Sequence, residues 1–162
     1  MTPTIRPASQ ADIPALLDLL GQVLKIHNEG RPDIFRTPSE GHPIVKYTAG
    51  DLETMLKDDR RVILAAETGG RVCGYAFCEL KRLESDNIFT PILTMYIDDI
   101  CVDASARGEH VGTALYKAVK DIARSHGCHN ITLRVWEFNG PAVSFYEKMG
   151  MGTQARIMEE IL

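Results

Sequence analysis

The sequence lacks the features that would place it in several common protein classes. No apolar run approaches the roughly twenty residues that span a bilayer, so we expect no membrane partner. The first residues, MTPTIRPASQADIP, have neither the charged start nor the apolar core of a signal peptide, which predicts a cytoplasmic protein. The formal net charge of -4 argues against nucleic acid as a partner, because a phosphate backbone requires a basic face.

Cysteine is scarce and forms no recognisable pattern. The chain has 4 cysteines, none of them in a CxxC pair, so we expect neither a disulfide framework nor a zinc site, and no other metal. Most of them lie in apolar runs, which favours buried free thiols. Cys101, beside the end of an apolar strand, carries the alternative of a catalytic thiol.

The glycines form neither of the common phosphate-binding loops. A Walker loop ends in Gly-Lys-Ser/Thr and a dinucleotide fingerprint has three glycines at fixed positions, and the chain has neither. The stretch from Asp98 to Leu115, DDICVDASARGEHVGTAL, instead runs from an apolar strand through Arg107 and Gly108 into a helix. The first N–H groups of such a helix and the positive end of its dipole favour an anion such as a diphosphate. The alternative is an ordinary strand-turn-helix connection.

Length and composition predict one domain over residues 1–162, because 44% hydrophobic residues suffice for one sizeable core. Periodicity and turn residues predict strands at 4–7, 61–67, 71–80, 92–102 and 130–136, and a closing strand at 153–162. They predict helices from Ser9 or Asp12 to His27, at 51–57, from Val111 to His126, and from the cap Asn139 to Gly150 or Gly152. The strand at 130–136 should run parallel to that at 92–102, since a helix connects the two.

Residues 28–47 form a long loop that glycine and proline interrupt. A loop of this length in a compact domain is more often functional than idle. Together with His27 it contains several polar residues and Phe35. It is either a solvated connection in which Phe35 packs on the core or a wall of a substrate pocket.

Two blocks of the sequence resemble the GNAT superfamily of N-acetyltransferases. Arg107-x-x-His110-x-Gly112, after Ile100-x-Val102, resembles the superfamily's coenzyme A loop, Arg/Gln-x-x-Gly-x-Gly/Ala. Residues 133–151, LRVWEFNGPAVSFYEKMGM, resemble its later pattern of strand, Asn, Ala, Phe-Tyr and Gly-Phe, and the opening IRPA with the Asp-Ile pair at 12–13 resembles its start. The family's first loop glycine is His110 here. We expect His110 in a helical first-turn conformation, with its backbone N–H in the role of the glycine's.

The resemblance implies an α/β (α+β) fold of the GNAT type in a single domain. In this fold a mixed, mostly antiparallel central sheet has helices on both faces, and its fourth and fifth strands are parallel and splay apart. The resemblance also implies acetyl-CoA as co-substrate, with the pantetheine arm against the backbone of Ile100, Cys101 and Val102. The other expected cofactor-binding residues are Arg107, Gly108, Glu109, His110, Val111, Gly112, Thr113, Asn139, Ala142 and Tyr146.

The acetyl thioester is then expected beside Asp98 and Asp99. A primary amine with a pKa of ~10.4 must lose a proton before it attacks a thioester, and these carboxylates are the best-placed acids. Successive strand residues point to opposite faces, so only one of the two would reach the cleft unless a bulge disturbs the strand. The alternative is a solvated strand end or a salt bridge with Arg134 or Lys81.

Tyr146 is the expected general acid for the CoA thiolate. On spacing alone it would be a core aromatic, since Ala142, Phe145, Tyr146 and Met149 share one face of a helix. The family pattern favours the catalytic role, because a Tyr directly after Phe or Leu at this distance beyond the Asn commonly places its hydroxyl beside the thioester sulfur. Asn139 similarly combines a helix cap with an expected cofactor contact.

The expected function is therefore an N-acetyltransferase that moves an acetyl group from acetyl-CoA to a primary amine by direct attack. The run IDDICV at 97–102 resembles the Leu-Glu-Asp-hydrophobic-x-Val run of the diamine acetyltransferase branch, which indicates small cationic amines or polyamines. The alternatives are a non-catalytic acyl-CoA-binding or sensing module, an acetyltransferase of a protein amino group, and an ATP-binding protein. The short ending favours completion of a sheet edge by a second subunit, with a monomer as the alternative.

Overall fold

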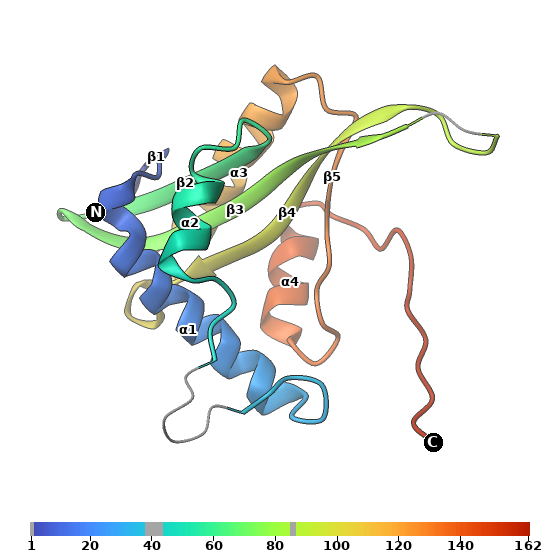
Figure 1. The fold of residues 1–162 in the computed structure, drawn as a ribbon, viewed down its shortest axis with the longest axis horizontal. Helices are drawn as coiled ribbons and strands as arrows, with labels where there is room; N and C mark the ends of the chain where they lie inside the picture. Colours follow the sequence, from blue (N-terminus) through green and yellow to red (C-terminus); the bar gives the residue numbers. More distant parts are fainter. Residues whose placement is uncertain (1, 38–43, 85–86) are drawn as a thin grey trace.

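The computed structural model describes residues 2–37, 44–84 and 87–162. Their strands form one sheet in the order β1-β2-β3-β4-β5, drawn in Figure 1. The strands are β1 (Thr4–Pro7), β2 (Arg61–Thr68), β3 (Arg71–Leu83), β4 (Ile92–Val102) and β5 (Asn130–Leu133). Neighbours from β1 to β4 are antiparallel, whereas β5 runs parallel to β4. The predicted mixed, mostly antiparallel sheet is confirmed.

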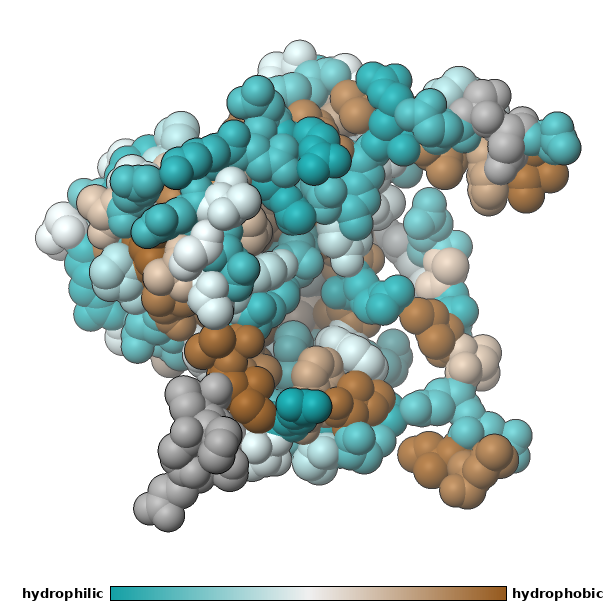
Figure 2. Space-filling model, in the orientation of Figure 1, coloured by the Kyte–Doolittle hydropathy of each residue, from teal (hydrophilic) through white to brown (hydrophobic). Residues whose placement is uncertain are grey.

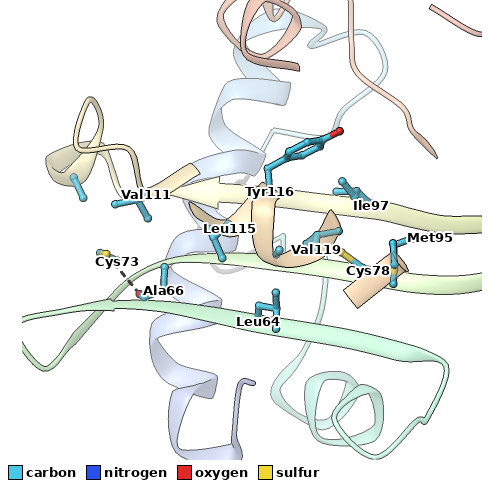
Figure 3. Packing of buried hydrophobic residues seen from close by; sticks show 13 residues of the cluster. Leu64, Ala66, Cys73, Cys78, Met95, Ile97, Val111, Leu115, Tyr116 and Val119 are labelled. Atoms are coloured by element: carbon cyan, nitrogen blue, oxygen red, sulfur yellow. Dashed lines mark hydrogen bonds between the residues drawn. The ribbon is translucent and has the colours of Figure 1, made fainter. Parts of the chain in front are cut away.

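Helices cover both faces of this sheet. On one face lie α1 (Ile13–Gly30), which follows the short 3-10 helix η1 (Gln10–Asp12), and α2 (Ala49–Met55); on the other lie α3 (Val111–Ser125) and α4 (Gly140–Lys148). Figure 3 shows α3 residues Leu115 and Val119 packed over Leu64 and Cys78 of the strands. A second cluster, on the opposite face, joins α1 and α2 to the buried rings of Tyr75 and Phe77.

Turn residues set the strand and helix ends where the sequence predicts them. Gly69 and Gly70 connect β2 to β3 with φ values of 59° and 79°, conformations that a residue with a side chain rarely adopts. Asn139 caps α4, since its Oδ1 accepts a hydrogen bond from the N–H of Ala142 at 3.3 Å. The hairpin and the α4 start are therefore confirmed.

A bulge in β4 opens the sheet between β4 and β5. Phe77 of β3 pairs with Asp99 and Cys78 pairs with Ile97, so Asp98 is an extra residue without a register partner on β3. Pairing of β4 with β5 also ends at this point, with Ile97 opposite Leu133. The two parallel strands separate from here on, and the predicted splay is confirmed.

Several predicted boundaries are wrong by a few residues. Strand β5 ends at Leu133 and not at residue 136, because its neighbour β4 bulges away immediately after Ile97. Strand β3 reaches Leu83, α1 continues to Gly30, and α2 begins at Ala49. Residues 38–43 and 85–86 of the two predicted connections lie outside the described part of the chain.

The predicted closing strand at 153–162 is wrong. These residues have no regular secondary structure, because no strand of the described chain pairs with them, and they extend away from the body in Figure 1. Arg31 holds them through two hydrogen bonds to Glu159, of 2.8 and 2.9 Å. Their apolar residues remain in solvent, with Ile157 78% exposed, as the brown atoms of the tail in Figure 2 illustrate. Completion of the sheet by a second subunit stays a prediction.

No helix in the described ranges combines the length and the apolar character needed to cross a membrane.

Candidate active site

A cavity of about 1130 Å³ occupies the gap where β4 and β5 separate. Its floor is β4 from Tyr96 to Val102, and its other walls come from α1, the segment before α2, the start of α3, residues 133–136, and α4. The predicted cofactor-binding residues in its lining are Ile100, Cys101, Val102, Arg107, Gly108, His110, Val111, Gly112, Thr113, Asn139, Ala142 and Tyr146. Glu109 is not part of the lining. The structure thus brings two distant blocks of the sequence, 100–113 and 139–146, to one cavity.

The loop between β4 and α3 is held in place by Asp103. This side chain caps the 3-10 helix η2 (Ala104–Ala106) by accepting a hydrogen bond from the Ser105 N–H at 2.8 Å. It also accepts a hydrogen bond from Gln22 Nε2 of α1 at 3.2 Å and pairs with Arg71 at 3.1 Å. These donors, Ser105 first, hold the pKa of Asp103 at about 2. These contacts fix the loop that places Arg107 at the cavity.

His110 adopts the left-handed conformation, with φ 61° and ψ 13°. The expectation of a helical first-turn conformation is therefore wrong. His110 is the N-cap residue and not the first residue of α3, so its backbone must turn the chain into the helix, as Gly108 with φ 83° does two residues earlier. Its side chain makes no capping hydrogen bond.

Both Asp98 and Asp99 face the cavity. The bulge places them there, because it adds one residue and so reverses which residues of β4 point to each face. Before the bulge Met95 and Ile97 pack on the α3 face; after it Ile100 packs there and Cys101 packs on the opposite face. The sequence predicts two carboxylates in the cleft only if a bulge disturbs the strand. The structure has this bulge.

Three donors clamp the carboxylate pair. The Tyr47 hydroxyl donates to Asp98 Oδ2 at 2.7 Å, and the Tyr75 hydroxyl donates to Asp99 Oδ2 at 3.1 Å. The Lys46 ammonium lies between them, with Nζ 3.1 Å from Asp98 Oδ2 and 3.5 Å from Asp99 Oδ2. The pair is therefore mostly buried, and among the described residues its ion pairs are to Lys46 and not to Arg134 or Lys81. The Lys81 Nζ lies instead 3.7 Å from the centre of the Tyr96 ring.

The two carboxylates differ in burial. The side chain of Asp99 is 12% exposed and that of Asp98 is 22% exposed. Burial raises the pKa of Asp99, and the charge of Asp98 adds to this, while Lys46 and the Tyr75 hydroxyl oppose it. A carboxylate with a raised pKa is a stronger base, so Asp99 is the better suited of the two to accept a proton from an amine.

Tyr146 lines the same cavity from α4. Burial raises the pKa of its hydroxyl, and the charge of Asp99 raises it further, so the phenol stays protonated at neutral pH. The neighbouring ring of Phe145 packs edge-on against Tyr116 of α3, with centroids 6.5 Å apart. Phe145 therefore serves the packing of α4 on α3, while Tyr146, one position later, lines the cavity.

Four rings form an aromatic wall beside the carboxylates: His27, Phe35, Trp136 and Phe138. His27 stacks on Phe35 with ring centroids 4.8 Å apart, and Phe35 meets Trp136 edge-on at 5.2 Å. Burial lowers the pKa of His27. Of the two interpretations of the loop 28–47, the structure supports a pocket wall for Phe35.

Cys101 is not suited to act as a catalytic thiol. Its sulfur is buried and donates to the carbonyl oxygen of Leu19 at 3.6 Å, on the α1 side of the sheet. Burial raises the pKa of this thiol to about 12, so it stays protonated at neutral pH.

Sequence reasoning missed Lys46, Tyr47 and Tyr75. Lys46 and Tyr47 directly precede Thr48, the cap of α2, and Tyr75 lies in the middle of a buried strand. No spacing links these residues to Asp98, because only the folded sheet brings the segments together. The one available signal was the polar Tyr hydroxyl in an otherwise apolar strand run, which requires a partner when buried.

Comparison with known proteins decides the family. A model described as Acetyltransferase (GNAT) family matches residues 23–151, more than half of the chain. The chain belongs to this family.

Three relatives illustrate the similarity. Thialysine N-epsilon-acetyltransferase of Mus musculus is 36% identical over 56 residues, which are 35% of this chain and 33% of that protein. Glucosamine 6-phosphate N-acetyltransferase of Trypanosoma brucei brucei is 40% identical over 63 residues, 39% of this chain and 41% of that protein. The matches thus span about a third to two fifths of these curated relatives. The crystal structure of a mutant BH1408 protein from Bacillus halodurans superposes with a TM-score of 0.92 at 27% identity, over 98% of this chain and 99% of that one.

The backbone at His110 has the geometry of a glycine position. The coenzyme A loop of the family carries a glycine at this position, and the left-handed backbone found here is the one that glycine adopts without cost. A histidine in this conformation is strained by about 1 kcal/mol or more relative to glycine.

Proposed function

We propose that this protein is an N-acetyltransferase that transfers the acetyl group of acetyl-CoA to a small primary amine carrying a positive charge at neutral pH. The observation that carries the proposal is the carboxylate pair Asp98 and Asp99, both turned into the cavity that the coenzyme A loop borders. A pair of carboxylates beside an aromatic wall favours a cationic ligand.

The residues around the start of α3 fit a diphosphate. The first N–H groups of the helix, at Val111, Gly112 and Thr113, have no carbonyl partner within the helix, and the positive end of the helix dipole lies there. The guanidinium of Arg107, exposed beside them, supplies a charged donor with two-pronged geometry. We assign the pyrophosphate of the co-substrate to this end and the pantetheine arm to the backbone of Ile100, Cys101 and Val102.

The chemistry has three requirements, and the cavity has a residue for two of them. The acceptor must lose a proton, and Asp99 is placed to accept it directly or through water, with Asp98 holding the ammonium. The leaving CoA thiolate must gain a proton, and the protonated Tyr146 hydroxyl can donate it. Attack of the neutral amine on the acetyl carbon forms the C–N bond as the C–S bond breaks. The donors to the developing oxyanion would be backbone N–H groups of β4, where it separates from β5.

The relatives support small amines as the acceptor class. One matched relative is named for thialysine and another for glucosamine 6-phosphate, both of which are small molecules with a primary amine. The aromatic wall and the carboxylate pair of this chain favour an amine with an apolar body. An amino group on a protein would have to enter as a single extended side chain.

A panel of amines tests the proposal. Release of free CoA thiol from acetyl-CoA would be followed with monoamines, diamines, polyamines, amino sugars, and a lysine peptide. The proposal predicts turnover with small cationic amines and little with neutral or anionic ones. Tight CoA binding with no turnover on any amine would instead support a non-catalytic acyl-CoA sensor. Turnover with the peptide alone would move the acceptor to a protein.

A further inference from the structure

Lys46 places a primary ammonium inside the proposed active site. Its Nζ lies 3.1 Å from Asp98 Oδ2 and 3.5 Å from Asp99 Oδ2, and its side chain lines the same cavity as Tyr146. Lys46 comes from the segment before α2, so it enters from outside the sheet and is not part of the strand that carries the acids. Its side chain is 35% exposed.

The two carboxylates that contact Lys46 are the ones assigned to the acceptor amine. A lysine side chain ends in a primary ammonium, the same chemical group as the proposed acceptor. The chain therefore holds an amine of its own where an external amine would bind. We propose that Lys46 is a self-acetylation site, modified within the same molecule by acetyl-CoA when no acceptor is present. This inference rests on the proposed acetyltransferase activity.

The step uses the groups already assigned to the reaction. The Lys46 ammonium gives one proton to the Asp99 carboxylate, whose burial favours the protonated form. The neutral amine then attacks the acetyl carbon, the C–N bond forms and the thioester C–S bond breaks. The departing sulfur takes a proton from the Tyr146 hydroxyl, which is restored by the second proton that the nitrogen loses. The products are N-acetyl-lysine at position 46, free CoA thiol and the proton left on Asp99.

Lys46 must be distinguished from lysines that react with acetyl-CoA without catalysis. Uncatalysed acetylation favours exposed amines, and Lys25 is such a site, with 77% of its side chain exposed and a single carboxylate at 3.9 Å. Lys46 is less exposed and is held by two carboxylates, so it should react more slowly than Lys25 without catalysis. Faster labelling of Lys46 than of Lys25 would therefore show that the active site catalyses the acetylation of Lys46.

The modification would remove the positive charge of Lys46. An acetylated lysine cannot pair with Asp98 and Asp99, so the carboxylates lose their internal partner. The same geometry makes Lys46 and an external ammonium competitors for one place. An added acceptor should therefore slow the labelling of Lys46 while leaving that of Lys25 unchanged.

The test is incubation of the full chain with isotopically labelled acetyl-CoA in the absence of any amine. Intact mass would count the acetyl groups, and peptide mapping would compare Lys46 with Lys25 over time. We expect one acetyl group at Lys46 before any at Lys25, with a first-order rate independent of protein concentration. Tyr146→Phe should lower the Lys46 rate by about a hundredfold, the usual contribution of a general acid. Lys46→Arg should abolish the early label, and the matched variant Lys25→Arg should keep it.

The outcomes separate this inference from the activity on which it rests. Turnover of the amine panel with Lys46 unmodified would overturn self-acetylation and leave the proposed function standing. Labelling of Lys25 ahead of Lys46 would also overturn it, because that order is the one expected of uncatalysed chemistry. A Lys46 rate that stays unchanged in Tyr146→Phe while the same variant loses amine turnover would overturn it as well, because the label would then form without the catalytic groups. Absence of both turnover and labelling would overturn the two proposals together.

Discussion

The two ends of the cavity are built in different ways. The proposed cofactor end, defined as residues 100–102 and 107–113, comes from a single segment of the chain that leaves β4 and enters α3. The acceptor end, defined as Lys46, Asp98, Asp99 and the aromatic wall, collects side chains from four separate parts of the chain. Backbone groups dominate the first and side chains the second. A backbone site is tied to the fold, whereas a side-chain site can change its ligand by a few substitutions.

Tyr146 lines the cavity from α4, and removal of its hydroxyl should have the largest effect on the rate. Tyr146→Phe deletes only the hydroxyl, so kcat should fall by about a hundredfold while the KM for acetyl-CoA changes little. Steady-state rates on the best amine of the panel would measure this. Thermal unfolding is the control, because the ring keeps its packing. A near wild-type kcat in a stable variant would mean that solvent protonates the thiolate and that Tyr146 is a packing residue.

Substitution of either carboxylate should change the kinetic constants for the amine and leave those for acetyl-CoA near their native values. Asp99→Asn should raise the amine KM by about tenfold or more, since a hydrogen bond to a charged group contributes about 1.5–3 kcal/mol, and CoA affinity should be nearly intact. Asp98→Asn should act in the same direction. Asp121→Asn, an exposed acid on α3 with 77% of its side chain in solvent, is the matched control.

The pH profile sharpens this prediction. The folded-state pKa of Asp99 is raised by burial, so the activity of the native enzyme should increase as the pH rises through that pKa and the base ionises. Loss of the base in Asp99→Asn should move the rising limb to higher pH, toward the pKa of the free amine. If both Asn variants kept the native amine KM and profile, the acceptor end would be misplaced.

Arg107→Ala should weaken the binding of acetyl-CoA at the proposed cofactor end. A phosphate contact far from the thioester is the same in the ground state and the transition state, so the KM for acetyl-CoA should rise by about tenfold with a smaller change in kcat. Arg124→Ala on the same helix, where the side chain is 68% exposed, is the matched control. Unchanged CoA affinity in Arg107→Ala would contradict the placement of the pyrophosphate.

His110→Gly should have the smallest effect. Glycine adopts the left-handed backbone freely, so CoA affinity should be similar or higher. The free energy of unfolding should rise by at most about 1 kcal/mol, because the greater freedom of glycine in the unfolded chain offsets part of the relieved strain. Titration of CoA and denaturant unfolding would measure the two quantities. Loss of CoA binding would show that the imidazole itself is a ligand.

The difference between the two ends also determines how much of each could be predicted from the sequence. The loop at 107–113 is a local motif, so its residues and its resemblance to the GNAT family can be read along the chain. The parallel direction of β4 and β5 followed from the helix that connects them, and their splay from the resemblance. The clamp of Lys46, Tyr47 and Tyr75 could not be predicted, because it depends on a one-residue bulge and on contacts between segments at least 24 positions apart. The closing strand was predicted wrongly for a related reason: residues 153–162 extend away from the edge strand β5 (Figure 1), and local sequence does not specify pairing with a distant strand.

The most direct test of the account is one matrix of initial rates, with acetyl-CoA and the best amine varied together for the wild type, Arg107→Ala and Asp99→Asn. We predict that Arg107→Ala raises the KM for acetyl-CoA and leaves the amine KM near its native value, while Asp99→Asn does the reverse. The opposite pattern, with native acetyl-CoA KM in Arg107→Ala and a raised one in Asp99→Asn, would contradict the assignment of the two ends of the cavity.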